Sequence, residues 1–223
     1  MASRAYRSER RRADAAATRE QIRRAATRLF VEQGYAATSL RQVAAAAGVA
    51  ERTLYAAFAS KFDLFHHALD VATVGDELPI PVRDRPEMVE PLTEPDASVA
   101  LAAGTDYGVD LLERAGDLIW AGVEAAGADA RLRALSDAGR HETRAVMLRF
   151  TKSLAERGAL RPDLDAERAA DVLFALSSPH LFRLLRRDAG WSTEQYRSWM
   201  HAITAEQLLG RPGPGGPPDR AAA

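Results

Sequence analysis

The sequence predicts an all-α protein of about nine or ten helices, with an N-terminal head of short helices, a fourth helix and a larger helical body. Two observations support this prediction. Apolar residues recur at helical spacing along most of the chain, and no segment shows the strict alternation of a half-buried strand. In addition, several of these segments begin with helix-capping pairs, such as Ser39 with Gln42 and Ser192 with Gln195.

The composition is that of a globular protein with a core. The chain has 223 residues, 47% of them hydrophobic, which is enough for one large or two modest domains. It contains no cysteine, which excludes disulfides and thiolate metal sites. No apolar run reaches the roughly 20 residues of a membrane span, and no apolar stretch follows the arginine-rich N-terminus as in a secretion signal. We therefore expect a cytoplasmic protein without a membrane partner.

Charge is distributed unevenly along the chain. Residues 1–67 hold 12 Lys and Arg against 6 Asp and Glu, whereas the remaining residues hold 18 against 25. A basic N-terminal part joined to an acidic remainder is the layout of a nucleic-acid-binding domain carried on another domain.

The first 17 residues are predicted to form a basic flexible arm, because the run Arg10–Arg12 stands in a stretch without hydrophobic periodicity. Such an arm either contacts DNA or is a solvated tail, and the sequence leaves both readings open. The first helix is predicted to begin at Thr18, which forms a capping box with Gln21, and to stop at Gly34.

The next segment has the pattern of a helix-turn-helix. Two short helices, Leu40–Ala47 and Glu51–Phe58, flank a turn at Gly48, where glycine takes the positive φ that ends a helix. The second of these helices presents polar side chains outward and fits a DNA major groove. A further helix is predicted from Lys61 to about Val74. The residues predicted to lie inside are Leu40, Val43, Ala44, Ala47, Val49, Leu54 and Phe58.

These residues resemble the N-terminal domain of TetR-type bacterial transcriptional regulators. The resemblance rests on the runs GYAATSLRQVA at 34–44, AGV at 47–49 and TLYxxFxSKxxL at 53–64. Two positions depart from the family pattern: Ala50 stands where a Ser or Thr usually caps the recognition helix, and Ala57 where a His often precedes the Phe. Losing that cap costs about 1 kcal/mol of helix stability. The resemblance implies that helices four to seven enclose an inducer pocket and that the last two helices form a dimer contact.

The remainder of the chain is predicted to be helical apart from a linker and a tail. Five prolines at 75–96 mark the linker, with a short helical turn around Pro86–Leu92. The glycine- and proline-rich residues 210–223 are predicted to be disordered. The helices predicted between them lie at 97–126, at 130–135 and 140–157, from Asp165 with a restart at Pro179, and from Ser192 onward.

Motifs for catalysis and cofactors are missing from the sequence. Because it has no phosphate-binding loop, dinucleotide fingerprint or nucleophile elbow, we expect no enzyme, catalytic residue or cofactor. The histidines lack ligand partners at helical spacing, so we expect no metal site.

The candidate small-molecule site is centred on Trp120. Asp117 lies one turn from Trp120 on the same helix face, and such a pair either lines an apolar cavity with one polar anchor or consists of a core Trp and a solvated Asp. Helix-face geometry and the resemblance add four candidate lining residues, Tyr107, Arg144, Met147 and Phe150.

The last two predicted helices carry more large apolar surface than one side of a small body covers. They either close the core of the monomer or, as the resemblance implies, form an isologous dimer contact. The candidate interface residues are Phe174, Leu181, Phe182, Leu185, Tyr196, Trp199, Met200 and Ile203.

Together these features predict a ligand-responsive repressor that binds a palindromic operator in double-stranded DNA as a homodimer, with an unidentified small-molecule effector. The alternatives are a DNA-binding activator or co-regulator without a ligand, and a small all-α enzyme that retains a helix-turn-helix. In the predicted complex Arg52 and Thr53 read bases, whereas Tyr55, Lys61 and the hydroxyls of the second helix bind phosphates. The predicted DNA-binding residues are Arg10, Arg11, Arg12, Thr38, Ser39, Arg41, Glu51, Arg52, Thr53, Tyr55 and Lys61. The predicted divisions are an arm at 1–17, a helix-turn-helix domain at 18–74, a linker at 75–96, a regulatory and dimerisation domain at 97–209 and a tail at 210–223.

Overall fold

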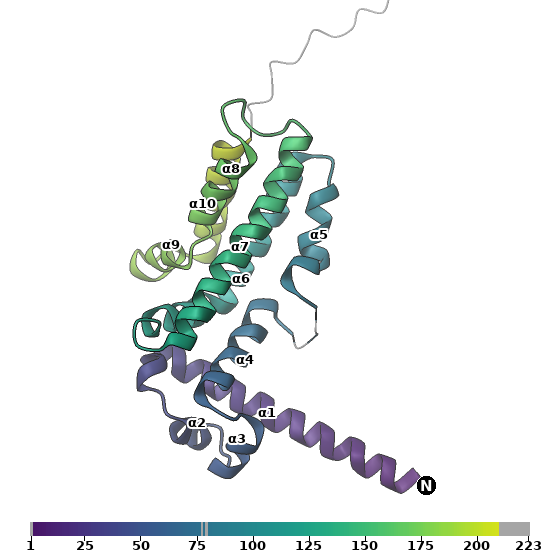
Figure 1. Ribbon diagram of the computed structural model, residues 1–223, viewed down its shortest axis with the longest axis vertical. Coiled ribbons are helices and arrows are strands. Elements are labelled where there is room, and N and C mark those ends of the chain that lie inside the picture. Colours follow the sequence, from purple (N-terminus) through teal and green to yellow (C-terminus); the bar gives the residue numbers. More distant parts are fainter. Residues whose placement is uncertain (1, 77, 79, 210–223) are drawn as a thin grey trace, which may run out of the picture. The chain divides into compact units, whose positions relative to one another are not determined.

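The computed structural model describes residues 2–76, 78 and 80–209, with side chains from Arg10 onward (Figure 1). Within these residues the chain forms ten α-helices, a 3₁₀ turn and a π-helical turn, and the one extended pairing is an isolated bridge between Leu160 and Leu209. The all-α prediction is therefore confirmed. The predicted tail, 210–223, lies outside the described residues.

The chain divides into two compact units. The first unit consists of residues 1–78 together with 111–139. The second unit consists of residues 79–110 together with those from 140 onward. Both units are therefore discontinuous in sequence.

This division differs from the predicted one, which assigns the whole of 97–209 to the body. Two long helices, α6 (Ala97–Ala125) and α7 (Ala130–Glu156), contribute residues to both units. Residues 111–139 belong with the N-terminal helices because their apolar side chains enter the same hydrophobic cluster. The buried members of that cluster from 111–139 are Leu118, Ala121 and Leu132.

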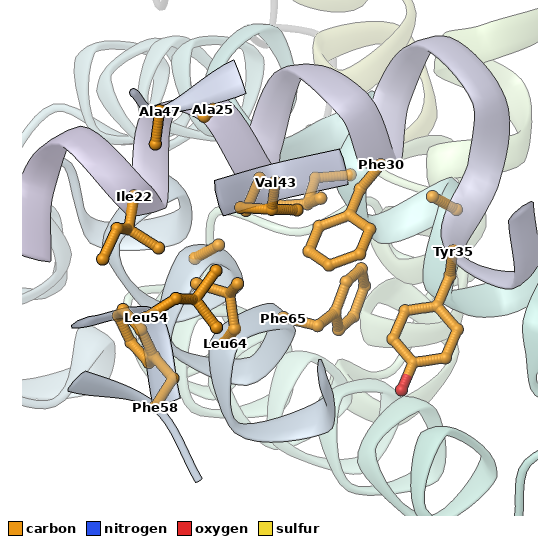
Figure 2. Close-up of a cluster of buried hydrophobic side chains, with 14 of the residues drawn as sticks. Ile22, Ala25, Phe30, Tyr35, Val43, Ala47, Leu54, Phe58, Leu64 and Phe65 are labelled. Atoms are coloured by element: carbon orange, nitrogen blue, oxygen red, sulfur yellow. The ribbon is translucent and has the colours of Figure 1, made fainter. Parts of the chain in front are cut away.

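Four N-terminal helices form most of the first unit. They are α1 (Ala2–Ala37), α2 (Leu40–Ala46), α3 (Glu51–Ala57) and α4 (Lys61–Val74). Three aromatic rings of their shared core, Phe30, Tyr35 and Phe65, contact one another, with centroids 5.2 to 5.6 Å apart (Figure 2). Phe65 meets both other rings edge to face, an arrangement that adds to the stabilisation from burial. Leu54 of α3 is fully buried in the same cluster, and this fixes which face of α3 points to solvent.

Helix α1 begins much earlier than predicted. Residues 2–17, the predicted flexible arm, are helical, and the Thr18 hydroxyl donates to the Asp14 carbonyl at 2.8 Å instead of capping a helix start. Side chains at 10–17 are exposed, so apolar periodicity gives no sign of this part of the helix, whereas the helix propensity of its alanines and arginines favours it. The helix breaks at Gly34, whose φ is 82°, in agreement with the predicted stop.

Six further elements and parts of α6 and α7 form the second unit. Leu92, from the predicted linker, packs against the buried core of this unit. The predicted helix start at Asp165 and the capping box of Ser192 with Gln195 are confirmed. The elements are a 3₁₀ turn η1 (Val82–Asp84), α5 (Pro86–Thr93), α8 (Ala166–Leu176), α9 (Pro179–Arg183) with the π-helical turn η2 (Leu184–Asp188), and α10 (Thr193–Leu208). The buried core of the unit consists of Ala100, Leu101, Phe150, Leu154, Ala169, Leu173 and Leu208.

Helix α7 is a single helix, whereas the sequence predicts two helices at 130–135 and 140–157. The predicted break lies next to Gly139, which remains inside the helix. A glycine within a helix costs about 1 kcal/mol relative to alanine, which weakens a helix without ending it when the flanking turns are otherwise favourable. The helix ends at Glu156, shortly before Gly158, as predicted.

Candidate nucleic-acid interface

The helix-turn-helix forms as the sequence predicts. Ser39 caps α2 by accepting from the Gln42 N–H, and the Gln42 side chain accepts in turn from the Ser39 N–H at 2.8 Å. Gly48 has a φ of 65°, and the following Val49 N–H donates to the Ala44 carbonyl at 3.0 Å. The turn is therefore closed by backbone hydrogen bonds, and α3 follows from it directly.

Helix α3 turns a polar face to solvent. Glu51 and Arg52 are exposed, the Tyr55 side chain is 54% exposed, and Thr53 is half-buried. The N-terminal Ala50 makes no side-chain capping hydrogen bond, as the sequence predicts. A two-turn helix with these side chains on its open face has the dimensions and chemistry of a major-groove reader.

Five predicted DNA-binding residues lie beside this face or on α1. Ser39 is exposed, and its hydroxyl is occupied by the cap, donating to the Gln42 Oε1 atom at 2.7 Å. Arg41 of α2 is highly exposed and lies 3.8 Å from Glu51, measured from Nε to Oε1. The Arg10–Arg12 run is exposed on the N-terminal part of α1.

Two predicted phosphate contacts instead make hydrogen bonds within the domain. Thr38 is 1% exposed, and its hydroxyl donates to the carbonyls of Gly34 at 2.8 Å and Leu29 at 3.2 Å. Lys61 donates from Nζ to the carbonyls of Tyr35 at 2.9 Å and Thr38 at 3.0 Å. Burial lowers the pKa of the Lys61 ammonium below its ordinary value.

Sequence reasoning misses two residues that hold the helix-turn-helix in place. The Gln21 side chain donates from Nε2 to the Ala47 carbonyl at the end of α2, at 2.6 Å. Arg19 donates from its guanidinium to the Ala57 carbonyl at the end of α3, at 2.6 Å, and lies 4.2 Å from the centre of the Phe58 ring. For Arg19, the sequence offers one general signal, which is that cationic side chains are favourable at helix C-termini. It does not identify which helix end an arginine reaches.

Replacing Lys61 by methionine is expected to destabilise the first unit by about 1–2 kcal/mol, because the carbonyls at the end of α1 lose a charged donor. Denaturant unfolding followed by circular dichroism measures the change. Lys152→Met, at an exposed lysine of the second unit, is the matched control and is expected to change stability by less than about 0.5 kcal/mol. Equal, small effects of both substitutions would contradict the capping role of Lys61.

The predicted ligand-pocket residues are not gathered within one unit. Asp117 and Trp120 belong to the first unit, whereas the other four belong to the second. Arg144 forms an ion pair with Asp171 at 2.8 Å, and Phe150 is 9% exposed in the second core. Met147 packs against the same core, and Tyr107 is half-buried.

The second unit carries an open depression of about 480 Å³ that the sequence does not predict. Two indole rings, Trp191 and Trp199, meet edge to face there with centroids 5.9 Å apart. Trp199 was identified from helical spacing, but Trp191 lies in the preceding turn, where periodicity gives no signal. The residues that line the depression are Trp191, Glu194, Gln195, Ser198 and Trp199.

Three of the predicted dimer residues belong to the core of the second unit. Phe182 and Tyr196 are fully buried and meet edge to face at 5.5 Å, and Met200 is 3% exposed. The burial of these three side chains within the single chain favours the alternative that they close the monomer core. The predicted interface residues that stay partly accessible are Phe174, Leu181, Leu185, Trp199 and Ile203.

The described residues contain no helix with the length and apolar character of a membrane span. The same part of the chain contains no group of three or more His, Asp or Glu side chains arranged to hold a metal ion.

Comparison with known proteins places the helix-turn-helix in a family. Residues 22–68 match the family described as bacterial regulatory proteins, tetR family. A search of curated protein sequences gives no match to this chain.

Solved structures of regulators share the fold of the whole chain. A putative transcriptional regulator from Saccharomonospora viridis in complex with choline is similar with a TM-score of 0.68 and 19% identity, covering 88% of this chain and 100% of its own. The SmeT–triclosan complex has a TM-score of 0.67 and 20% identity, covering 93% and 100%. NalD, the secondary repressor of the MexAB-OprM multidrug efflux pump in Pseudomonas aeruginosa, has a TM-score of 0.64 and 23% identity, covering 88% and 98%.

The family match covers α2 and α3, including the polar face of α3, together with parts of α1 and α4. The structural similarity extends over both units. The Saccharomonospora viridis protein is described as a transcriptional regulator and NalD as a repressor. The resemblance predicted from the sequence is therefore confirmed for the N-terminal domain: residues 22–68 belong to the family of bacterial regulatory proteins of the tetR type, and the chain as a whole shares the fold of solved transcriptional regulators.

Proposed function

We propose that this protein is a ligand-responsive repressor that binds a palindromic DNA operator as a homodimer in the cytoplasm. The observation that carries the proposal is the polar face of α3, where Glu51, Arg52 and Tyr55 are exposed while Leu54 anchors the helix in the core. A helix held in this way presents a fixed set of side chains to the edges of base pairs.

In the proposed complex each contact has a defined role. Arg52 and Thr53 read base edges in the major groove, and Tyr55 binds a phosphate. The exposed run Arg10–Arg12 on α1 adds sequence-independent attraction to the DNA backbone. Thr38 and Lys61 support the domain from inside and are not part of the proposed DNA surface.

The homodimer is proposed to form through the part of the second unit that runs from α8 to α10 and includes α9 and η2. Apolar side chains of this region that the monomer core leaves accessible, such as Leu184 at 56% exposure, support this assignment. The depression beside Trp191 and Trp199 adds a concave surface that carries two indole rings and three polar residues, and that a second copy can fill. A two-fold symmetric contact would match the symmetry of a palindromic operator.

A small-molecule effector is proposed because two proteins of the same fold were solved as complexes with choline and with triclosan. Within the first unit, α4 and α6 are in close contact, since a Cβ added at Gly122 would lie 3.0 Å from the Phe65 ring. A ligand that displaces this part of α6 would therefore displace α4 and, with it, α3. The ligand releases DNA only to the extent that it binds the non-DNA conformation more tightly.

Selection of bound duplexes from a random DNA pool, followed by a salt titration on the selected sequence, tests the proposal. The expected result is a palindrome whose binding constant falls steeply with salt, because several phosphates are neutralised at once. If no sequence is enriched and binding is absent at low salt, the proposed function is wrong. Titration of the purified complex with candidate effectors then tests the ligand response.

Replacing Arg52 by alanine is expected to cost about 1–3 kcal/mol in operator binding and to relax specificity at one base pair. The loss should be confined to sequences that carry the preferred base pair, because the guanidinium reads a base edge. Arg10→Ala is the contrasting variant, expected to weaken all duplexes alike and to reduce the salt slope by about one. Uniform weakening by Arg52→Ala would assign Arg52 to the backbone instead.

A further inference from the structure

A carboxylate and a guanidinium lie side by side on the proposed DNA surface. Glu51, in the first turn of α3, is the sole acidic residue from 33 to 62. The Arg41 Nε atom on α2 lies 3.8 Å from the Glu51 Oε1 atom, and their side chains are 86% and 55% exposed. An exposed pair of this kind contributes little to stability. A carboxylate in the first turn favours the dipole of α3, but this does not account for the guanidinium of α2 that stands beside it.

A carboxylate is costly on a surface that faces phosphates unless it finds a hydrogen-bond donor. In the major groove the donors are the amino groups of cytosine and adenine, and acidic side chains typically accept from cytosine N4. A guanidinium has the complementary requirement, because it donates to two acceptors at once, and guanine offers O6 and N7 side by side. Adenine does not meet it, since its N6 donor stands next to its N7 acceptor.

The two requirements are met together by one base pair. Cytosine N4 and guanine O6 are hydrogen-bonded to each other, so they lie about 3 Å apart at the floor of the groove. The 3.8 Å separation of Arg41 and Glu51 matches this spacing of acceptor and donor. An A·T pair reverses the pattern, since its amino donor lies on the purine and its second acceptor on the pyrimidine.

We propose that Arg41 and Glu51 together read a single G·C base pair in each operator half-site, Arg41 contacting guanine and Glu51 contacting cytosine. This inference rests on the proposed function and names the base pair that one part of the surface selects. On docking, the Arg41–Glu51 pair is exchanged for contacts with the two bases, so neither charge is left without a partner. Arg41 is thereby a base reader, although the first helix of a helix-turn-helix commonly lies against the backbone.

The test uses the full-length protein and the operator selected by the unchanged chain. Duplexes are made in which each invariant G·C pair of the half-site is replaced in turn by A·T, and their dissociation constants are measured. The variants are Arg41→Lys, which keeps the charge but loses the bidentate donor, and Glu51→Ala. Glu32→Ala removes an exposed carboxylate from α1 of the same unit and is the matched control.

The expected result is one G·C pair whose replacement weakens binding by the unchanged protein about 10-fold or more. For Arg41→Lys and Glu51→Ala this ratio should fall toward one at that same pair, while discrimination at other positions and in Glu32→Ala is retained. Because both side chains read one pair, the double variant should lose little discrimination beyond either single variant.

Three outcomes would overturn the inference and leave the proposed function standing. Full discrimination by Arg41→Lys would make Arg41 a phosphate contact. Tighter binding of Glu51→Ala to all duplexes equally would make Glu51 merely repulsive. Loss of discrimination at different base pairs in the two variants would show that the two side chains do not read one pair. Absence of any selected operator would instead mean that the proposed function itself is wrong.

Discussion

Replacing Phe65 by alanine is expected to destabilise the first unit by about 3–5 kcal/mol, the cost of removing a fully buried aromatic ring. Phe65 of α4 contacts Phe30 and Tyr35 of α1 edge to face, with centroids 5.2 Å away in both cases. On another side it faces the backbone of α6 at Gly122. Because the cavity would be lined by elements that pack against one another, we expect it to collapse only in part. Denaturant unfolding of the full-length protein measures the loss.

Phe62→Ala is the matched control for this substitution. Phe62 lies on the same helix and is half-buried, with its ring 5.8 Å from His66 and an Arg131 guanidinium 4.9 Å from its centre. We expect it to cost less than half as much as Phe65→Ala, because less apolar area returns to water. Equal losses would mean that the core of the first unit is not centred on Phe65.

Phe182→Ala is expected to destabilise the second unit by about 3–5 kcal/mol for the same physical reason. The Phe182 ring is fully buried, meets Tyr196 edge to face at 5.5 Å and has the Arg187 guanidinium 5.5 Å from its centre. The loss should therefore appear in the unfolding of the unit at every protein concentration. An unfolding transition measured at several concentrations separates this effect from a loss of self-association.

Leu184→Ala provides the comparison, because Leu184 is 56% exposed and lies only two residues away. We expect it to weaken self-association in sedimentation experiments while leaving the unfolding free energy at a fixed degree of association nearly unchanged. If Phe182→Ala weakened self-association without lowering the free energy of unfolding, Phe182 would be an interface residue and its assignment to the core would be wrong.

Features set by neighbouring residues were predictable from the sequence. The capping boxes at Ser39 and Ser192 and the turn at Gly48 each depend on a few consecutive residues, so their patterns predict them directly. The polar face of α3 follows from helical spacing in the same way. The family resemblance rests on these same local features, which is why the type of the domain could be predicted.

Features that depend on distant contacts could not be predicted. Lys61 reaches the carbonyl of Tyr35, 26 positions away, and Arg19 reaches that of Ala57, 38 positions away. Helical spacing predicts on which face of a helix a residue lies, but it does not predict which other element packs against that face. The same limit explains Phe182, whose helix spacing is compatible with either a core or an interface. The helical start of α1 could not be predicted for a different reason: its described side chains are exposed, so no apolar periodicity indicates a helix there.

The exposed start of α1 also sets how far the Arg10–Arg12 run reaches. Residues 2–17 span about 24 Å as a helix but about 53 Å as an extended chain. Because the side chains at 10–17 are exposed to solvent, packing contributes little to the helical state of this segment. The fraction of molecules in which the segment is helical therefore follows a local helix–coil equilibrium, which shifts toward coil on warming. Warming is therefore expected to lengthen this segment and to extend the distance over which the charges of the Arg10–Arg12 run can reach.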